Sequence, residues 1–483
     1  MDLKGFFNKL GYDISEKENW NKNLDLWQSW YRGKVRKFHN YYIYNGQRKV
    51  KREKKSLQGA KKVCEDWADL LFNEKVKINL SNQESTEKLS NIFEDNNAVV
   101  TINQGIEKTF ALGTGALVVS VEDLYANEND EIVDINEAKV KLEFVEGRKI
   151  YPLTWNSVEI TECAFVSYKA IAGKNYAFIS IHRLDELKNY VIDNYKYEVR
   201  NATLIVVEND KNEGFLGTFK TKSNLPWFSI LKPNICNNIE EDTPWGISVY
   251  ANSVDTLKSL DNSYNELDNE VVLGRRRTFI AEEMMNYDNG QEELTFDPED
   301  ISVYRMPKGF NKDSMIQSSS EALRTEDLQK ATQFQLNILS AKVGFGQERY
   351  QFDGKSIQTA TGVISENSDM YRTIKKHEQV LENSLKTMIK SMAYASSTFT
   401  VNKIDASEIT IDFDDSVIED KGAEQVRAQQ EVVAGLRSKQ DYIKQIRGLG
   451  EKEAQEELDR IQQEKMSNQE AFGIILNEEK EEE

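Results

Sequence analysis

The sequence is poor in the residues from which most catalytic and metal-binding sites are built. Its three histidines and three cysteines stand far apart in 483 residues: His39, His182, His377, Cys64, Cys163 and Cys236. Zinc sites need closely spaced ligands and disulfide frameworks need paired cysteines, so both are excluded and a reducing cytoplasm is expected. Isolated histidines also give a catalytic triad or a metal pair little to build on. We therefore expect neither a metal nor another cofactor, and we interpret the histidines as satisfied surface or core residues.

Enzyme signatures are missing as well. The chain lacks the GxxxxGK[ST] loop that cradles nucleotide phosphates and the GxSxG turn of many hydrolases. Gly344-Phe345-Gly346 lacks the third glycine and the preceding strand of a dinucleotide-binding fingerprint. Asp412 and Asp414 share one face of a short strand and could hold a cation for a hydrolase, but acidic residues there more often cap the next helix. We expect a protein that is not an enzyme.

Long apolar runs and a basic domain are also absent. No window is long enough to span a bilayer and the chain does not start like a signal peptide, so a membrane partner is not expected. The formal net charge is −19, which repels polyanions over the surface as a whole. A protein that reads DNA sequence would carry a basic domain. If this chain meets nucleic acid, it is expected to let it pass rather than grip it.

Proline is scarce and confined to the middle of the chain. All six prolines lie between Pro152 and Pro307, and proline interrupts helices and central strands. The two ends are therefore predicted to be more helical than the middle. An N-terminal helix face is predicted from steps of four, three and four, and a second helix is predicted over 56–72. The first face consists of Trp20, Leu24, Trp27 and Tyr31.

Between these helices and the prolines, two stretches stand out by composition. A basic cluster runs from Arg48 to Lys55; it is either a solvated face or a contact with an anionic partner. Residues 139–209 contain segments rich in β-branched and aromatic residues about ten residues apart. This spacing predicts an antiparallel meander.

The second half of the chain is predicted to be built on long helices. Apolar residues three or four apart from Ile247 onward predict a helix of about 27 residues, roughly 40 Å long. Residues 275–319 instead show the pattern of a small module of short strands. The remaining predictions are helices over 320–343 and 359–394, a strand in EITIDF (408–413), a charged helical segment over 421–464 and a disordered acidic tail, LNEEKEEE.

Two groups of cationic residues are candidate sites. Arg275, Arg276 and Arg277 end the long helix, where they either complement its dipole or contact a partner or DNA. The second group lies in a glycine-broken loop between two helices, where sparse cations would make weak, sequence-blind phosphate contacts. An ordinary solvated loop is the alternative. The residues of the loop site are Lys342, Gly344, Gly346, Arg349, Tyr350, Asp353 and Lys355.

Three segments taken together resemble the portal protein of tailed bacteriophages that infect Gram-positive hosts. They are CEDWADLLFNEKV (64–76), TPWGISVYANSVDTLKSLDNSYNELDNEV (243–271) and VGFGQERYQFDGKSIQTATGVISENSDMYRTIKKHE (343–378). The resemblance covers roughly 20–415 and implies an α+β portal fold. It implies a wing of helices and antiparallel sheet (1–245), a stem helix (246–274), a clip (275–319), a stem or wing helix (320–343), a tunnel loop (344–356), a long wing helix and return (357–410) and a helical crown (411–483).

The same resemblance implies a function and a set of partners. Such portals form a ring, usually of twelve copies, at one capsid vertex of the virion, and double-stranded DNA is packaged and ejected through the channel. The ATPase is a separate protein, the large terminase subunit; it docks at the clip, here with Arg275, Arg276, Arg277 and Arg305, and a head-completion adaptor follows. Major capsid and scaffolding proteins are the other implied partners. A minor head or adaptor protein without a channel remains the alternative.

Overall fold

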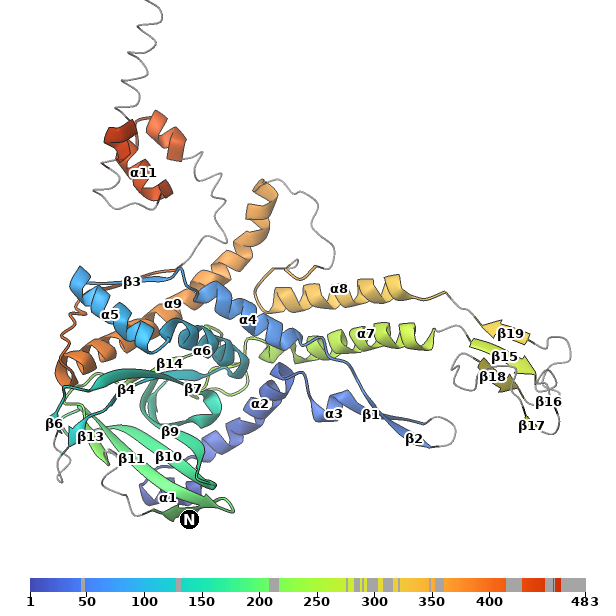
Figure 1. The fold of residues 1–483 in the computed structure, drawn as a ribbon, viewed down its shortest axis with the longest axis horizontal. Helices are drawn as coiled ribbons and strands as arrows, with labels where there is room; N and C mark the ends of the chain where they lie inside the picture. Colours follow the sequence, from blue (N-terminus) through green and yellow to red (C-terminus); the bar gives the residue numbers. More distant parts are fainter. Residues whose placement is uncertain are drawn as a thin grey trace, which may run out of the picture. The chain divides into compact units, whose positions relative to one another are not determined.

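The computed structural model combines helices and antiparallel sheets, as expected for an α+β chain (Figure 1). It describes residues 1–44, 48–126, 132–157, 159–207, 217–274, 277–281, 287–288, 291–292, 303–306, 316–319, 322–346, 349–351, 360–413, 428–447, 455 and 457–461. The chain divides into two compact units. The first comprises Met1–Gln358 and Ser365–Asp414, and the second comprises Thr359–Ile364 and Asp415–Glu483.

The first unit begins with helices whose aromatic faces are buried. After α1 (Leu3–Lys9), α2 (Ser15–Tyr31) buries Trp20, Leu24 and Trp27, which confirms the predicted face. Its last member is different, because the Tyr31 hydroxyl is half-buried and hydrogen-bonds to Glu107. The predicted helix over 56–72 is α4 (Gly59–Leu71). Neither α5 (Gln83–Asp95) nor α6 (Ala98–Leu112) was predicted from the sequence.

The predicted meander is confirmed as an antiparallel sheet in the order β12-β11-β10-β9-β8, with β13 paired to β11. One face of this sheet packs on α1 through Phe6 and Phe7. A second sheet has the order β14-β4-β7. The strands of the two sheets are β4 (Gly115–Glu122), β7 (Lys139–Glu146), β8 (Ile150–Asn156), β9 (Glu159–Ile171), β10 (Lys174–Leu184), β11 (Tyr190–Arg200), β12 (Thr203–Val206), β13 (Thr218–Lys220) and β14 (Phe228–Leu231).

The predicted 27-residue helix is wrong in length. The α7 helix covers Val254–Leu273, 20 residues, which corresponds to roughly 30 Å. Before α7 the chain forms only a short 3-10 helix, Ala251–Ser253, and at Gly246 its backbone passes close to that of Gly113: a Cβ added at Gly246 would lie 2.2 Å from the Gly113 carbonyl oxygen. Tyr250 is buried in this segment, and its hydroxyl donates to the Trp27 carbonyl at 2.8 Å. The helical spacing of apolar residues in the segment before α7 therefore reflects tertiary packing, and the α-helix itself begins only at Val254.

Short strands follow α7, as predicted for 275–319. In the described part of this module, β15 (Arg277–Ala281) pairs in parallel with β18 (Val303–Met306) and antiparallel with β19 (Ile316–Ser319). A two-residue ladder joins β16 (Tyr287–Asp288) to β17 (Gln291–Glu292). The chain then returns through α8 (Thr325–Lys342), within the helix predicted over 320–343.

The second predicted long helix is α9 (Ala360–Phe399), which extends five residues beyond the predicted end. Its predicted inward face is buried at Ile374, His377, Leu381, Leu385, Met388 and Met392, whereas Tyr371 is 38% exposed. The EITIDF strand is confirmed as β20 (Ile409–Asp412), which pairs with β3 (Lys77–Leu80). Asp414, the partner of Asp412 in the cation hypothesis, lies outside the described residues.

Most of the basic cluster is an exposed strand, in keeping with the solvated face that was one of its two interpretations. It forms β2 (Lys49–Glu53), which pairs with β1 (Asn40–Tyr44) directly after the one-turn helix α3 (Arg36–His39). Two short strands, β5 (Tyr125–Ala126) and β6 (Ile132–Asp134), pair with each other in a separate sheet.

In the second unit the described helices are 428–433, α11 (Lys439–Arg447) and 457–461, so the described part of the segment predicted over 421–464 is helical with an interruption after residue 433. The interruption contains Gly435 at φ +73°. The predicted acidic tail lies outside the described residues.

Candidate functional site

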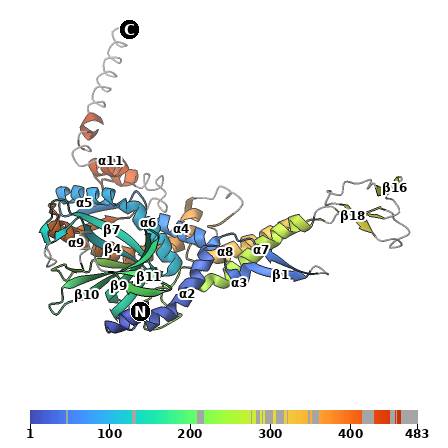
Figure 2. The same ribbon diagram turned by 60° about the horizontal axis from the view of Figure 1, so that its bottom comes forward.

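The α7 and α8 helices form an antiparallel pair, which Figures 1 and 2 show side by side. At one end, Arg324 binds both carboxylate oxygens of Glu270, with Nη2 to Oε2 at 2.8 Å and Nε to Oε1 at 3.3 Å. At the other end, Lys342 Nζ donates to Thr256 Oγ1 at 3.1 Å. Leucines are buried near this second end: Leu257, Leu260, Leu336 and Leu339. The pair is thus fixed at both ends. The strand module connects the two helices in the sequence, so the pair carries it.

The segment after α8 is anchored on α4 through an aromatic stack. Phe345 stacks on Trp67 with ring centroids 4.4 Å apart, and Trp67 Nε1 donates to the Val343 carbonyl at 3.2 Å. The chain reverses at Gly344, which has φ +93°; a Cβ there would lie 2.7 Å from Thr373 Cγ2. Glycine is therefore required both by the backbone conformation and by the close approach of α9.

The predicted loop has a second anchor at Tyr350. Its hydroxyl donates to Asp66 Oδ2 at 2.8 Å, and its carbonyl accepts from Gln333 Nε2 at 2.6 Å. Burial, followed by the charge of Asp66, raises the pKa of Tyr350, so this hydroxyl keeps its proton. Asp66 also accepts from Lys62 Nζ at 2.7 Å. The Arg349 guanidinium lies 5.8 Å from the Phe345 ring centre.

The structure places some of the predicted site residues and not others. Lys342, Gly344, Gly346, Arg349 and Tyr350 lie at the α8 end of the loop, and the two anchors above tie this part to α4. Asp353 and Lys355 lie outside the described residues, as do Arg275 and Arg276. The backbone places Arg277 and Arg305 on adjacent strands of one sheet, where Ile280 is opposite Arg305. The sequence did not reveal Asp66, because its partner is 284 residues away.

Two of the three histidines are satisfied by partners, as expected. His377 lies between Trp67 and Phe110, at 4.8 and 5.0 Å between ring centroids, and its Nδ1 accepts from the Asn234 amide at 3.0 Å. Burial lowers the pKa of His377 to about 3, so the ring is neutral at pH 7. His39 Nε2 lies 3.0 Å from Asp261 Oδ2 in a buried pair.

The third histidine lines a cavity between the two sheets. This space of about 810 Å³ is bordered by aromatic side chains, among them Phe144, Phe165 and Phe178. The side chains of His182 and Trp227 also border it, and His182 Nδ1 and Trp227 Nε1 are buried without a hydrogen-bond partner among the described residues. Burial lowers the pKa of His182 to about 3. Ser180 Oγ, which also borders the cavity, lies 3.4 Å from the other ring nitrogen of His182, Nε2.

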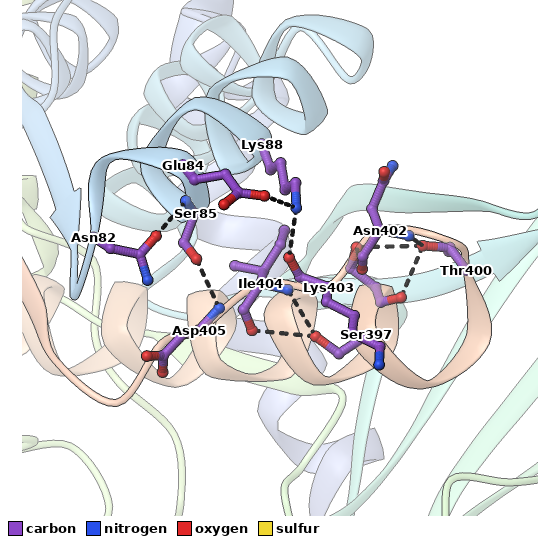
Figure 3. Close-up of polar contacts among 11 residues, drawn as sticks. Asn82, Glu84, Ser85, Lys88, Ser397, Thr400, Asn402, Lys403, Ile404 and Asp405 are labelled. Atoms are coloured by element: carbon purple, nitrogen blue, oxygen red, sulfur yellow. Dashed lines mark hydrogen bonds and ion pairs between the residues drawn. The ribbon is translucent and has the colours of Figure 1, made fainter.

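A polar cluster fixes the end of α9 to the start of α5 (Figure 3). The Asn82 side chain caps α5 by accepting from the Ser85 amide at 2.8 Å, and Ser85 Oγ in turn accepts from the Asp405 amide at 2.9 Å. Lys88 Nζ donates to Glu84 at 2.7 Å and to the Lys403 carbonyl at 3.2 Å. These bonds hold the turn between α9 and β20.

Within the described part of the chain, no helix is both long and apolar enough to cross a membrane. The same residues contain no group of three His, Cys, Asp or Glu side chains that would suit a metal ion.

Comparison with known proteins identifies a family for nearly the whole chain. The family model of the phage portal protein, SPP1 Gp6-like, matches residues 10–471. No curated protein matches the sequence. Among solved structures, a chain described as the neck of a native GTA particle computed with C12 symmetry aligns with 10% identity and a TM-score of 0.39, over 81% of this chain and 90% of that one. The protein therefore belongs to the SPP1 Gp6-like family of phage portal proteins.

Proposed function

We propose that this portal protein forms a ring around a channel, at one capsid vertex, through which double-stranded DNA is packaged and ejected. The observation that carries the proposal is the antiparallel pair of α7 and α8, fixed at both ends by Glu270–Arg324 and Lys342–Thr256. A ring around DNA needs rigid rods repeated about an axis, and each copy supplies one such pair. The acidic net charge of −19 fits a channel that lets a polyanion pass.

Within this proposal the segments have separate tasks. Residues 275–319 form the clip, which docks the terminase and later the head-completion adaptor. Residues 246–274 and 320–343 form the stem, 1–245 and 357–410 the wing, and 411–483 the crown. The tunnel loop, 344–356, meets the DNA. Because Phe345 and Tyr350 are tied to α4, we expect residues 352–356 to be the part of this loop that reaches furthest toward the DNA.

Deleting residues 352–356 tests the loop assignment. We expect rings to assemble as in the wild type and DNA packaging to fall, because the loop's anchors on Trp67 and Asp66 remain. A matched deletion of five residues within 208–216, between β12 and β13, is the control and is expected to package normally. Packaging is measured as DNA protected from nuclease in assembled heads. Normal packaging by the 352–356 deletion would show that the assignment is wrong.

Arg275→Ala combined with Arg277→Ala tests the clip assignment. We expect weaker binding of the terminase or of the adaptor to preformed rings, measured by co-sedimentation, with ring size unchanged. If the double variant instead fails to form rings, the arginines serve the stem helix and its dipole.

The adaptor or minor head protein remains a second candidate. Its prediction differs in one respect: such a protein would join the particle without forming a free ring of its own.

A further inference from the structure

The β1–β2 hairpin carries three large apolar or aromatic side chains that are exposed. Tyr42 is 67% exposed, Ile43 is 45% exposed and Tyr44 is 65% exposed. The hairpin is a two-stranded sheet without a third strand, and two-stranded hairpins are marginally stable on their own. A surface of this kind on a folded protein marks an interaction site.

The chemistry of the hairpin is specific as well as apolar. Cross-strand partners lie on the same face, and the register pairs Tyr42 with Lys51 and Tyr44 with Lys49. One face therefore alternates tyrosine and lysine, and we call it the Tyr/Lys face. Lys49, Lys51 and Arg52 are exposed and make no ion pair with the described residues. The face would fit a surface that is acidic and offers an aromatic side chain.

The base of the hairpin is held rigidly on α7. His39 and Asp261 form their buried pair there, and Lys54 Nζ donates to Asn262 Oδ1 at 2.7 Å. Lys55 Nζ binds Asp268 Oδ1 at 2.6 Å. These contacts use successive turns of one side of α7, so the hairpin projects from α7 in a defined direction.

A surface of the required chemistry lies on α8. Phe334 is 62% exposed, on the side of the helix away from the buried Leu336. One turn and two turns before it, the small Ala331 and the acidic Asp327 are exposed, and Glu326 is exposed beside Asp327. We call Asp327, Ala331 and Phe334 the α8 stripe. Lys330 is exposed beside the stripe. The acidic part of the stripe is therefore confined to Asp327, in the first turn of α8.

The two surfaces cannot cover each other within one chain. In Figure 1 the hairpin and α8 lie on opposite sides of α7. A contact between different surfaces of identical chains is heterologous, and repeated heterologous contacts close into a ring when the rotation allows. We propose that the Tyr/Lys face of one copy docks on the α8 stripe of the neighbouring copy. This inference rests on the proposed ring and names its contact between subunits.

Site-specific photocross-linking tests the contact. A benzophenone amino acid in place of Phe334 is expected to join two copies, with the cross-linked peptide falling within 40–53. The same amino acid in place of Tyr168, a tyrosine that is 56% exposed on β9, is the control and is expected to give no cross-link to that peptide.

The outcomes separate the inference from the function on which it rests. Rings with the Phe334 cross-link in 40–53 support both. Rings whose Phe334 cross-links fall elsewhere overturn the docking and leave the ring intact. A wild-type protein that forms no ring overturns both.

A charge exchange gives an independent check. Lys51→Asp and Asp327→Lys are each expected to raise the protein concentration for half-maximal ring assembly by roughly five-fold, as for one lost surface ion pair of about 1 kcal/mol. The double variant is expected to regain the wild-type value. Additive losses in the double variant would contradict a direct pairing of these two surfaces.

Discussion

Lys17 shows how far single residues depart from their usual behaviour in this protein. Its ammonium is 3% exposed, donates to the Gly147 carbonyl at 2.5 Å and lies 4.5 Å from the Trp245 ring centre. Burial lowers the pKa of Lys17 to about 7. Lys17 precedes Trp20 by three residues, so the helical periodicity that predicted the buried face of α2 already contained it.

The buried lysine predicts a pH dependence of stability. Above pH 7 the folded protein releases the proton of Lys17, whereas the unfolded chain keeps it up to about pH 10.5. The unfolded state then binds more protons, so the contribution of Lys17 to the free energy of unfolding rises with pH over this window. Between pH 7 and 9 we expect a rise of about 2 kcal/mol that Lys17→Met lacks. The measurement is urea unfolding of both proteins at each pH. Parallel pH profiles would contradict the assignment.

Replacing Gly344 with alanine tests two separate costs of a side chain at this position: the positive φ and the steric contact with α9. Gly344→Ala pays for a positive φ and for the contact with Thr373, whereas Gly173→Ala, at φ +79°, meets no atom within 4 Å. We expect Gly173→Ala to lower the free energy of unfolding by about 1 kcal/mol and Gly344→Ala by about 2–4 kcal/mol. Chemical denaturation measures both. Equal losses would mean that the approach of α9 to this turn is looser than the structure indicates.

At the scale of elements, α7 connects the hairpin, the strand module and the α8 partner. The connection to the hairpin depends on Asp261, which is 3% exposed and accepts from the Leu57 amide at 2.9 Å in addition to pairing with His39. A buried carboxylate with two partners from another segment fixes that segment more firmly than exposed ion pairs do.

Asp261→Ala is therefore expected to destabilise the protein by about 2–4 kcal/mol, because it leaves His39 and a backbone amide unpaired in a buried place. Glu266→Ala, an exposed residue of the same helix without a contact to the hairpin among the interactions described, is the control and is expected to change stability by less than about 1 kcal/mol. Thermal unfolding followed by circular dichroism compares the two. A similar small effect of both would place the anchor of the hairpin elsewhere.

The same elements show what the sequence could and could not predict. Periodicity predicted α2, α8, α9 and the meander, because each has a buried face that follows the repeat of its own backbone. It overextended α7, since Ile247 and Tyr250 have helical spacing but are buried by Trp27 and the Gly113–Gly246 crossing. No secondary structure was predicted for the basic cluster, whose strand β2 depends on its pairing with β1. Pairings between distant residues, such as Tyr350 with Asp66, leave no local pattern to read.

At the scale of the whole molecule, the chain belongs to a known family, and we propose how its copies assemble. The portal family is shown by the match over residues 10–471, and the ring, its channel and its contacts are proposals built on the α7–α8 pair. The large polar surface of the single chain fits this assembly, because part of it is expected to be covered by neighbouring copies. The α8 stripe and the Tyr/Lys face are the parts for which the structure suggests a partner.

The most direct test of the central claim is negative-stain electron microscopy of the purified protein, with class averages analysed for rotational symmetry. The account predicts closed rings, about twelve copies around, with a central hole wide enough for a DNA duplex of roughly 20 Å. Monomers or compact small oligomers, persisting at high concentration and in the presence of the scaffolding protein, would contradict it and favour the adaptor alternative.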